Sequence, residues 1–288
     1  MRTIRQPGPP APERVQWAEA RGRAFSFTLE AGIPLLEAAR RGFAAAGFAS
    51  GVLNFRAGAL GPFAYVMPAL AKDGEHAAFY SDTFRPAGIA RPGIGAMTFG
   101  RRDGAPFFHC HALWIEADGR PGGGHILPEE TFVAEPFDVD AFGLDGAGFV
   151  AEPDPETNFK LFGPLPSATT GAETTSNAFA LRLRPNQDFA TALESFCRAR
   201  GIRHAKIHGG VGSTIGVRFA DGRMVEPFAT ELAIRSGVIA LGAGDALVAE
   251  LDIALIDYTG GIAVGRPVRG DNPVLMTMEL VLEVLNGT

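Results

Sequence analysis

Three histidines lie close together between Phe108 and Leu127, in the stretch FHCHALWIEADGRPGGGHIL. His109 and His111 are separated by one residue, so on an extended strand both side chains leave the same face and Cys110 leaves the other. Two imidazoles on one face of a strand can hold a metal ion together. This spacing is also common in strands whose histidines face solvent or a carbonyl group, so it is a weak signal by itself.

A third histidine lies beyond a predicted hairpin. Asp118 and Gly119 are typical of a tight turn, and the chain returns through three consecutive glycines to His125. Opposite residues of an antiparallel pair share a face, so a three-residue loop over Ala117 to Gly119 would place His125 across from His111. A two-residue loop would not. In the favourable register three imidazoles converge.

Three neutral imidazoles on one side of a divalent ion leave at least one coordination position open for water or a ligand. Zinc is the first expectation, with iron, nickel or cobalt as alternatives, because imidazole binds several borderline metals. The sequence therefore predicts a divalent transition-metal site at His109, His111 and His125. It assigns no catalytic residue and no organic cofactor.

Length and charge limit the functions that the chain can have. The 288 residues are 46% apolar and carry a formal net charge of −6, which predicts a soluble protein with room for two domains. No stretch gathers basic residues, and this disfavours nucleic-acid binding. Two distant cysteines, with no recognisable secretion signal or membrane-length apolar run, predict a cytoplasmic protein without a disulfide or a membrane partner.

The first part of the chain reads as an arm followed by an α+β domain. Prolines in residues 1–22 predict an extended arm that could lie over a neighbouring subunit. A strand is expected from Arg23, and a helix is expected between Pro34 and Gly47. The domain would end at residue 163, and residues 164–176, rich in Pro, Ser and Thr, would form a linker.

The same order returns in residues 177–288. A strand, a turn and a helix follow one another, with Asn186 as the expected helix N-cap and Gly201 as its C-terminal stop. Setting Gly47 against Gly201 aligns the two helices without a gap, which suggests an internal duplication. The apolar segment VLMTMELVLEVL is then expected to be the last strand of the second domain.

The duplication extends to the hairpin. Aligning Gly119 with Gly261 superposes it on LDIALIDYTGGIAVGRP. The histidine positions in this second copy then hold two apolar residues and a proline: Leu251, Ile253 and Pro267. Any metal site therefore belongs to the first copy.

The chain resembles the plants-and-prokaryotes conserved (PPC or PCC) domain, in two tandem copies. The residues that carry the resemblance are the opening strand and helix, the HCHALW hairpin ending in GGGH, the DPETNFKL tail and, in the second copy, TELAIRSGVIALG. The resemblance implies two α+β domains of the α/β sandwich type, at residues 23–163 and 177–288. Each would have a mostly antiparallel sheet with a packed helix. It also implies a homotrimer and, in prokaryotic members, a metal held by the HxH and GGH histidines near a subunit contact.

Three functions remain open. The chain could be an oligomeric protein that binds a transition metal and a small-molecule ligand through its first domain. It could be a metal-dependent hydrolase or lyase, or a DNA-binding protein, as prokaryotic relatives are often named. An AT-hook needs Arg-Gly-Arg-Pro among basic residues, whereas this chain has only Gly-Arg-Pro, in two expected hairpins. Whether the chain is an enzyme is not decided by its sequence.

One acid extends the metal hypothesis to the second copy. Glu231 begins the Glu-to-Gly strand, and the matching position in the first copy is Ile94. One copy holds the histidines and the other the acid, so Glu231 could approach the site if the two copies pack together. The alternative is a solvent-exposed strand carboxylate.

Overall fold

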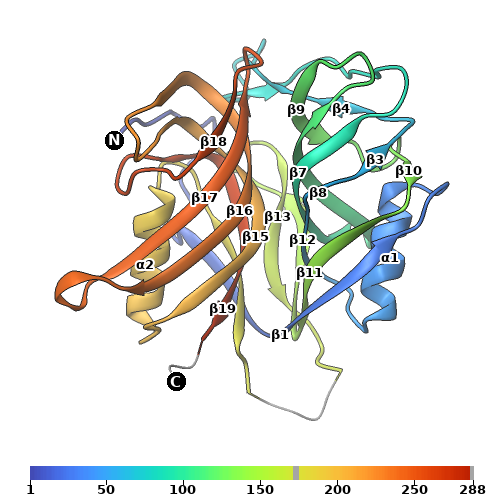
Figure 1. Ribbon diagram of the computed structural model, residues 1–288. Helices are drawn as coiled ribbons and strands as arrows, with labels where there is room; N and C mark the ends of the chain where they lie inside the picture. Colours follow the sequence, from blue (N-terminus) through green and yellow to red (C-terminus); the bar gives the residue numbers. More distant parts are fainter. Residues whose placement is uncertain (171–174, 286–288) are drawn as a thin grey trace.

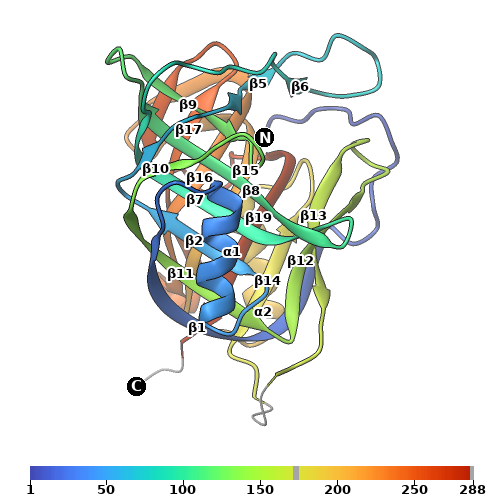
Figure 2. The same cartoon turned by 90° about the vertical axis from the view of Figure 1, so that its right-hand side faces the viewer.

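The computed structural model describes residues 1–170 and 175–285. Two halves lie side by side, each with a strongly twisted sheet and one helix on its outer side (Figure 1). Figure 2 shows the helix of the first half lying across its sheet. Within the described residues no helix is long and apolar enough to span a membrane.

The first half contains one long sheet, helix α1 and short strands around the rim. Its main strands are neighbours in the order β1-β11-β2-β7-β8-β9, and each adjacent pair is antiparallel. The elements are β1 (Val15–Leu29), α1 (Leu35–Ala45), β2 (Gly51–Phe55), β3 (Ala59–Leu60), β4 (Tyr65–Val66), β5 (Pro68–Ala69), β6 (Phe79–Tyr80), β7 (Arg91–Arg102), β8 (Ala105–Ile115), β9 (Pro121–Ile126), β10 (Val133–Glu135), β11 (Phe137–Asp145), β12 (Ala147–Pro153) and β13 (Lys160–Pro166).

The second half repeats this strand order. Its strands are neighbours in the order β14-β19-β15-β16-β17-β18, again antiparallel throughout. In both halves the opening strand leads into the helix and pairs with a strand from late in that half. The expected α+β class with mostly antiparallel sheets is confirmed. The elements are β14 (Ala178–Leu183), α2 (Phe189–Ala199), β15 (Ala205–Arg218), β16 (Met224–Leu241), the 3-10 turn η1 (Ala243–Asp245), β17 (Leu247–Asp257), β18 (Ile262–Gly265) and β19 (Val274–Val284).

Strand β1 joins the two halves into one sheet. Its first part, Val15 to Ala20, pairs with β14 of the second half. Its remainder, Arg21 to Leu29, pairs with β11 of the first half. The strand expected from Arg23 therefore begins earlier, because the residues before it complete the ladder of the second half.

The proline-rich arm before β1 lies on the second half of its own chain. The Asn186 side chain accepts a hydrogen bond from the Ile4 backbone N–H and donates one to the Ile4 carbonyl, both at 2.9 Å. Gln6 donates through Nε2 to the Leu275 carbonyl at 2.7 Å. These contacts give the arm partners within one chain.

Both helices end where the glycines predict, but α2 begins differently. Gly47 and Gly201 have φ values of 83° and 67°, the left-handed conformation that ends a helix. The N-cap of α2 is Asp188, whose carboxylate accepts a hydrogen bond from the Thr191 N–H at 2.8 Å. The prediction of Asn186 as N-cap was wrong, because that side chain is held by the arm.

The first residues of the expected linker are part of a strand. β13 continues to Pro166 and pairs with β12. Prolines at 164 and 166 are tolerated because β13 is an edge strand that pairs on one side only. Residues 171–174 of the expected linker lie outside the described residues.

Each half has its own hydrophobic core between sheet and helix. Phe43 of α1 and Leu193 of α2 are fully buried at the centres of these cores. The opposite faces of the two sheets approach each other through the small side chains Ala96, Val211 and Ala233. This close approach places the histidine face of β8 against the second half.

Candidate metal centre

The alternation of β8 separates its histidines from its core residues as predicted. His109 and His111 are buried on the face that meets the second half, with 9% and 4% exposure. Cys110 and Trp114 point the other way and pack in the core of the first half. Neither is available as a further ligand.

The hairpin has the register that brings the third histidine into the site. His111 is the direct cross-strand partner of His125. The loop is closed by a hydrogen bond from the Glu116 N–H to the Arg120 carbonyl at 2.8 Å, so three residues, 117–119, lie between the two that close it. The favourable alternative of the sequence analysis is confirmed.

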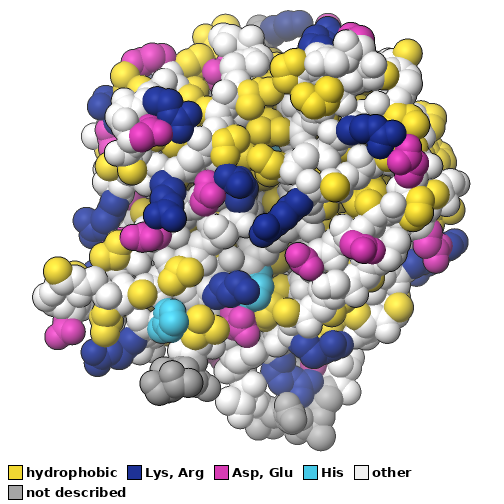
Figure 3. Space-filling view, in the orientation of Figure 1, with side chains coloured by type: hydrophobic (Ala, Val, Ile, Leu, Met, Phe, Trp, Pro, Cys, Tyr) yellow, Lys and Arg dark blue, Asp and Glu magenta, His cyan; other side chains and the backbone are white. Residues whose placement is uncertain are grey.

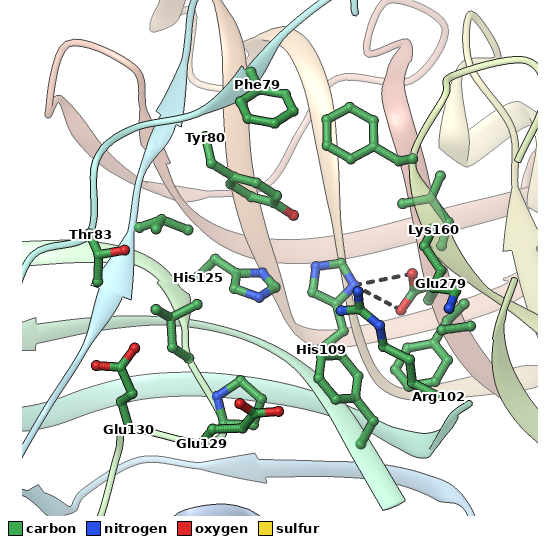
Figure 4. Close-up of a pocket in the computed structure, with 18 of the residues that line it drawn as sticks. Phe79, Tyr80, Thr83, Arg102, His109, His125, Glu129, Glu130, Lys160 and Glu279 are labelled. Atoms are coloured by element: carbon green, nitrogen blue, oxygen red, sulfur yellow. Dashed lines mark hydrogen bonds and ion pairs between the residues drawn. The ribbon is translucent and has the colours of Figure 1, made fainter. Parts of the chain in front are cut away.

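The three imidazoles form one compact cluster. Their ring centroids are 4.5 Å apart for His109 and His111, 5.0 Å for His109 and His125, and 5.5 Å for His111 and His125. One nitrogen from each ring lies within 4.8 Å of the other two. Figure 4 shows His109 and His125 side by side at a cavity wall. The sequence-predicted ligands are therefore brought together.

The second half holds two of these rings in a metal-binding orientation. Nδ1 of His109 lies 3.0 and 3.1 Å from the carboxylate oxygens of Glu279, and Nδ1 of His111 lies 2.9 Å from the Leu232 carbonyl. Both partners are acceptors, so we assign a proton to each Nδ1, which leaves a lone pair on Nε2 of each ring in its neutral form. The two Nε2 atoms are only 3.0 Å apart. Two lone pairs at this distance repel each other unless a cation is bound between them. Carboxylate or carbonyl partners behind ligating histidines are also typical of metal sites.

The third ring offers an unused nitrogen. Nδ1 of His125 is buried and has no hydrogen-bond partner among the described residues. A buried polar atom without a partner is rare and costs free energy unless something binds it. Three neutral nitrogens, two of them oriented and one unpaired, fit a divalent transition metal.

The pKa values favour neutral rings. Burial lowers the pKa of His111 well below its ordinary value of 6.5, and the neighbouring His109 and His125 lower it further. The pKa of His125 is also lowered well below 6.5, by burial first and then by His109 and Arg102. Two ligands are thus unprotonated at neutral pH, the state in which imidazole binds metal.

Glu231 also lies beside the cluster. Its Oε1 is 3.8 Å from Nε2 of His111, and the residue is only 6% exposed. Burial raises the pKa of Glu231 well above 4.5, and a backbone hydrogen bond at His125 opposes this increase. The hypothesis that Glu231 approaches the histidines is confirmed, and the solvent-exposed alternative was wrong.

A small chamber of about 50 Å³ lies on the Glu231 side of the cluster. Hydroxyl-bearing residues line it, including Ser213, Thr230 and Thr277. Oε2 of Glu231 is buried without a hydrogen-bond partner among the described residues. The chamber exceeds the volume that one water molecule needs, so it can supply water to this carboxylate.

Sequence reasoning missed Glu279. The residue is fully buried on β19, in the centre of the apolar run VLMTMELVLEVL. An acid within a strand that is otherwise almost entirely apolar was the available signal, because buried carboxylates need partners. The partner of the Glu279 carboxylate is His109 of the first half.

We expect the Glu279→Gln variant to bind zinc about 10- to 100-fold more weakly than the wild type, because the charged acceptor behind His109 is lost. A competition titration against a chelating dye would measure this affinity. Glu283→Gln is the matched control, since Glu283 lies on the same strand but binds His208 at 2.6 Å. Equal zinc affinities in the two variants would contradict the role of Glu279.

The hairpin of the second half is shifted by one residue from the sequence alignment. Its loop is closed by a hydrogen bond from the Asp257 N–H to the Gly261 carbonyl at 2.9 Å, which corresponds to the bond that closes the loop of the first hairpin. Leu251 and Ile253 consequently lie in the core beside α2, as Cys110 does beside α1. The prediction that apolar residues replace the histidines was therefore wrong.

Charged residues occupy the histidine positions in the second half: Glu250, Asp252 and Arg266. Arg266 lies 3.8 Å from Glu250, and Arg235 lies 3.1 Å from Asp252. These are ion pairs between partly or largely exposed side chains. The second half thus carries no histidine at this place, and the candidate centre belongs to the β8–β9 hairpin of the first half.

A larger cavity of about 590 Å³ opens onto His109 and His125 (Figure 4). Segments from both halves line it, including Tyr80 of β6 and Glu279 of β19. Its volume is within the range of roughly 300–1,000 Å³ for small-molecule sites. The cluster can therefore be reached by a ligand.

Comparison with known proteins finds a family match in the second half. Residues 170–286 match the Plants and Prokaryotes Conserved (PCC) domain. No curated protein matches the chain.

Solved structures of several prokaryotic proteins align with about half of the chain. A plant- and prokaryote-conserved (PPC) protein from Pyrococcus horikoshii is 18% identical with a TM-score of 0.40, over 50% of this chain and 94% of that chain. A metal-containing protein from Archaeoglobus fulgidus is 18% identical with a TM-score of 0.40, over 51% and 96%. A protein from Bacteroides thetaiotaomicron, named for a suspected role in DNA binding, is 16% identical with a TM-score of 0.31, over 40% and 83%. The family match therefore covers residues 170–286, which are similar to the Plants and Prokaryotes Conserved domain.

Proposed function

We propose that this protein binds a divalent transition metal, zinc in the first place, through His109, His111 and His125, together with a small ligand in the adjoining cavity. The observation that carries the proposal is the pair of Nε2 atoms, 3.0 Å apart, whose rings are fixed by acceptors at both Nδ1 positions. A bound ion would act as a Lewis acid toward an oxygen of the ligand. Residues of the second half orient His109 and His111, and burial favours the neutral forms of His111 and His125.

We further propose that the first half is a diverged copy of the domain matched in the second. The shared order of strands, with the helix after the opening strand in both, supports this. The two copies then contribute different groups to one site. The first supplies the imidazoles, and the second supplies Glu279, the Leu232 carbonyl and Glu231.

Catalysis as a metal-dependent hydrolase or lyase is the second candidate function. Glu231 favours it, because a buried carboxylate with a free oxygen beside a water-sized chamber can accept and return a proton. This function requires turnover of a substrate in addition to binding.

Nucleic-acid binding has less support. On the face shown in Figure 3, acidic and basic side chains are intermixed and form no continuous basic surface among the described residues. The net charge of −6 also disfavours binding to the negatively charged phosphate backbone of a nucleic acid.

The test is zinc content as a function of pH, measured by elemental analysis on untagged protein reconstituted with zinc. We expect one ion per chain at neutral pH and release only below pH 6.5, because burial lowers the pKa values of His111 and His125 from that value. In metal-free protein the unfolded chain takes up these protons first, so the free energy of unfolding also falls as pH drops below 6.5. Absence of zinc after reconstitution would refute the proposal, and release above pH 6.5 would refute the account of the pKa values.

A further inference from the structure

The large cavity beside the histidines has aromatic walls. It is open to solvent, and His109 and His125 form part of its lining. Phe79 and Phe159 lie 5.6 Å apart between ring centroids, and Tyr80 lies 5.9 Å from Phe159. Phe107 and Phe162 continue the lining at a centroid distance of 6.1 Å. Walls of this kind favour a flat apolar body.

One cation in the cavity lining, the guanidinium of Arg102, has N–H groups that donate no hydrogen bond to the described residues. The Arg102 guanidinium lies 5.1 Å from the centre of the Phe107 ring and makes no hydrogen bond to the described residues. Its nearest carboxylate, that of Asp103, is 3.9 Å away and is already bound by Lys160 at 2.5 Å. Figure 4 shows Arg102 beside His109. A planar guanidinium with free donors suits a carboxylate, which it can bind with two parallel hydrogen bonds.

The acids around the cavity are mostly occupied. Glu130 is bound by Arg85 at 2.6 and 2.9 Å, and Glu279 is bound by His109. Glu129 is exposed to solvent. Among the charged side chains that line the cavity, Arg102 is therefore the cation whose hydrogen-bond donors remain available to a ligand.

A neutral donor lies across the cavity from this cation. The Tyr80 hydroxyl points into the cavity (Figure 4) and makes no hydrogen bond to the described residues. Its phenol O–H can donate a hydrogen bond to an oxygen of the ligand.

We propose that this cavity binds a small organic carboxylate with an aromatic body. Arg102 receives the carboxylate, the aromatic side chains enclose the body, and Tyr80 donates to an oxygen near the histidines. The placement of that oxygen beside the metal rests on the proposed function, whereas recognition by Arg102 does not. The two parts can be measured separately.

The experiment is a calorimetric titration of the full chain with phenylacetate, phenylacetamide and inorganic phosphate, in metal-free and zinc-loaded protein. In metal-free protein we expect phenylacetate to bind about tenfold or more tightly than its neutral amide, because only the acid forms a charge-assisted pair with Arg102. Arg102→Met should remove this difference by weakening the acid about tenfold. Arg101→Met is the matched control, since Arg101 is the exposed neighbour on β7 and does not line the cavity.

The inference would be overturned if phenylacetate did not bind to the folded protein, if acid and amide bound equally, or if Arg102→Met left the binding unchanged. Phosphate binding as tightly as phenylacetate would also overturn it, because the aromatic walls would then contribute nothing. If the chain binds no zinc but phenylacetate binds in an Arg102-dependent manner, the metal proposal fails and this inference stands. A circular dichroism melt of each variant shows that it is folded.

Discussion

The His109→Ala/His111→Ala variant is expected to bind no zinc under conditions in which the wild-type chain binds one ion. These two rings supply the Nε2 pair at 3.0 Å, and one remaining imidazole cannot hold a divalent ion in competition with water. Elemental analysis gives the ion content directly. Chemical unfolding gives a second measurement, because a ligand that binds only the folded state stabilises it by about 2.7 kcal/mol at one hundred times its dissociation constant.

The control for this variant is His204→Ala. His204 is an exposed histidine of the second half and is not part of the cluster. We expect this variant to keep its zinc and the zinc-dependent stabilisation. Zinc retained by the double variant would place the metal elsewhere, whereas loss of stability without any change in zinc content would indicate a purely structural role for the two histidines.

The Asp154→Ala variant is expected to lose about 3–5 kcal/mol of unfolding free energy, because it leaves a buried cation without its partner. Asp154 is 4% exposed, and its Oδ2 accepts hydrogen bonds from Arg182 and Arg184, each at 2.6 Å. Its Oδ1 accepts from the backbone N–H groups of Glu156 and Thr157. Urea unfolding monitored by circular dichroism would measure the loss.

The contribution of Asp154 also has a defined pH dependence. Burial alone would raise the pKa of this carboxyl, but Arg182 and Arg184 outweigh burial and lower it below 3.8. The contribution is therefore present above pH 3.8 and is lost as pH falls through the lowered value. Asp140→Ala is the control, since Asp140 is exposed and, within the part of the chain that the structure describes, its side chain binds only the Ser26 hydroxyl, at 2.9 Å. Equal losses in the two variants would contradict this account.

The histidine cluster could be predicted because its geometry is local. The spacing of His109 and His111 and the length of one loop determine which side chains share a face. The groups that orient the rings could not be predicted in the same way. Glu279 and the Leu232 carbonyl reach the site through packing of the two sheets, far along the chain, and no local pattern encodes that contact.

Two of the predictions from the sequence were wrong by only one or two residue positions. In a strand, a shift of one residue reverses the face of every side chain, so aligning Gly119 with Gly261 placed Leu251 and Ile253 at histidine positions although they belong to the core. Asn186 was predicted as the N-cap of α2, but Asp188, two residues later, is an equally good capping residue. In the structure the arm binds the Asn186 side chain, and Asp188 caps the helix.

The pairing of β1 with β14 has a consequence for the PCC segment taken alone. A strand at a sheet edge exposes unpaired N–H and C=O groups, which can recruit other chains and cause aggregation. Val15 to Ala20 shield β14 from this, yet they lie outside residues 170–286. We therefore expect the segment that the family match delimits to expose the edge of β14, and to be prone to aggregation, when it is expressed as an isolated fragment.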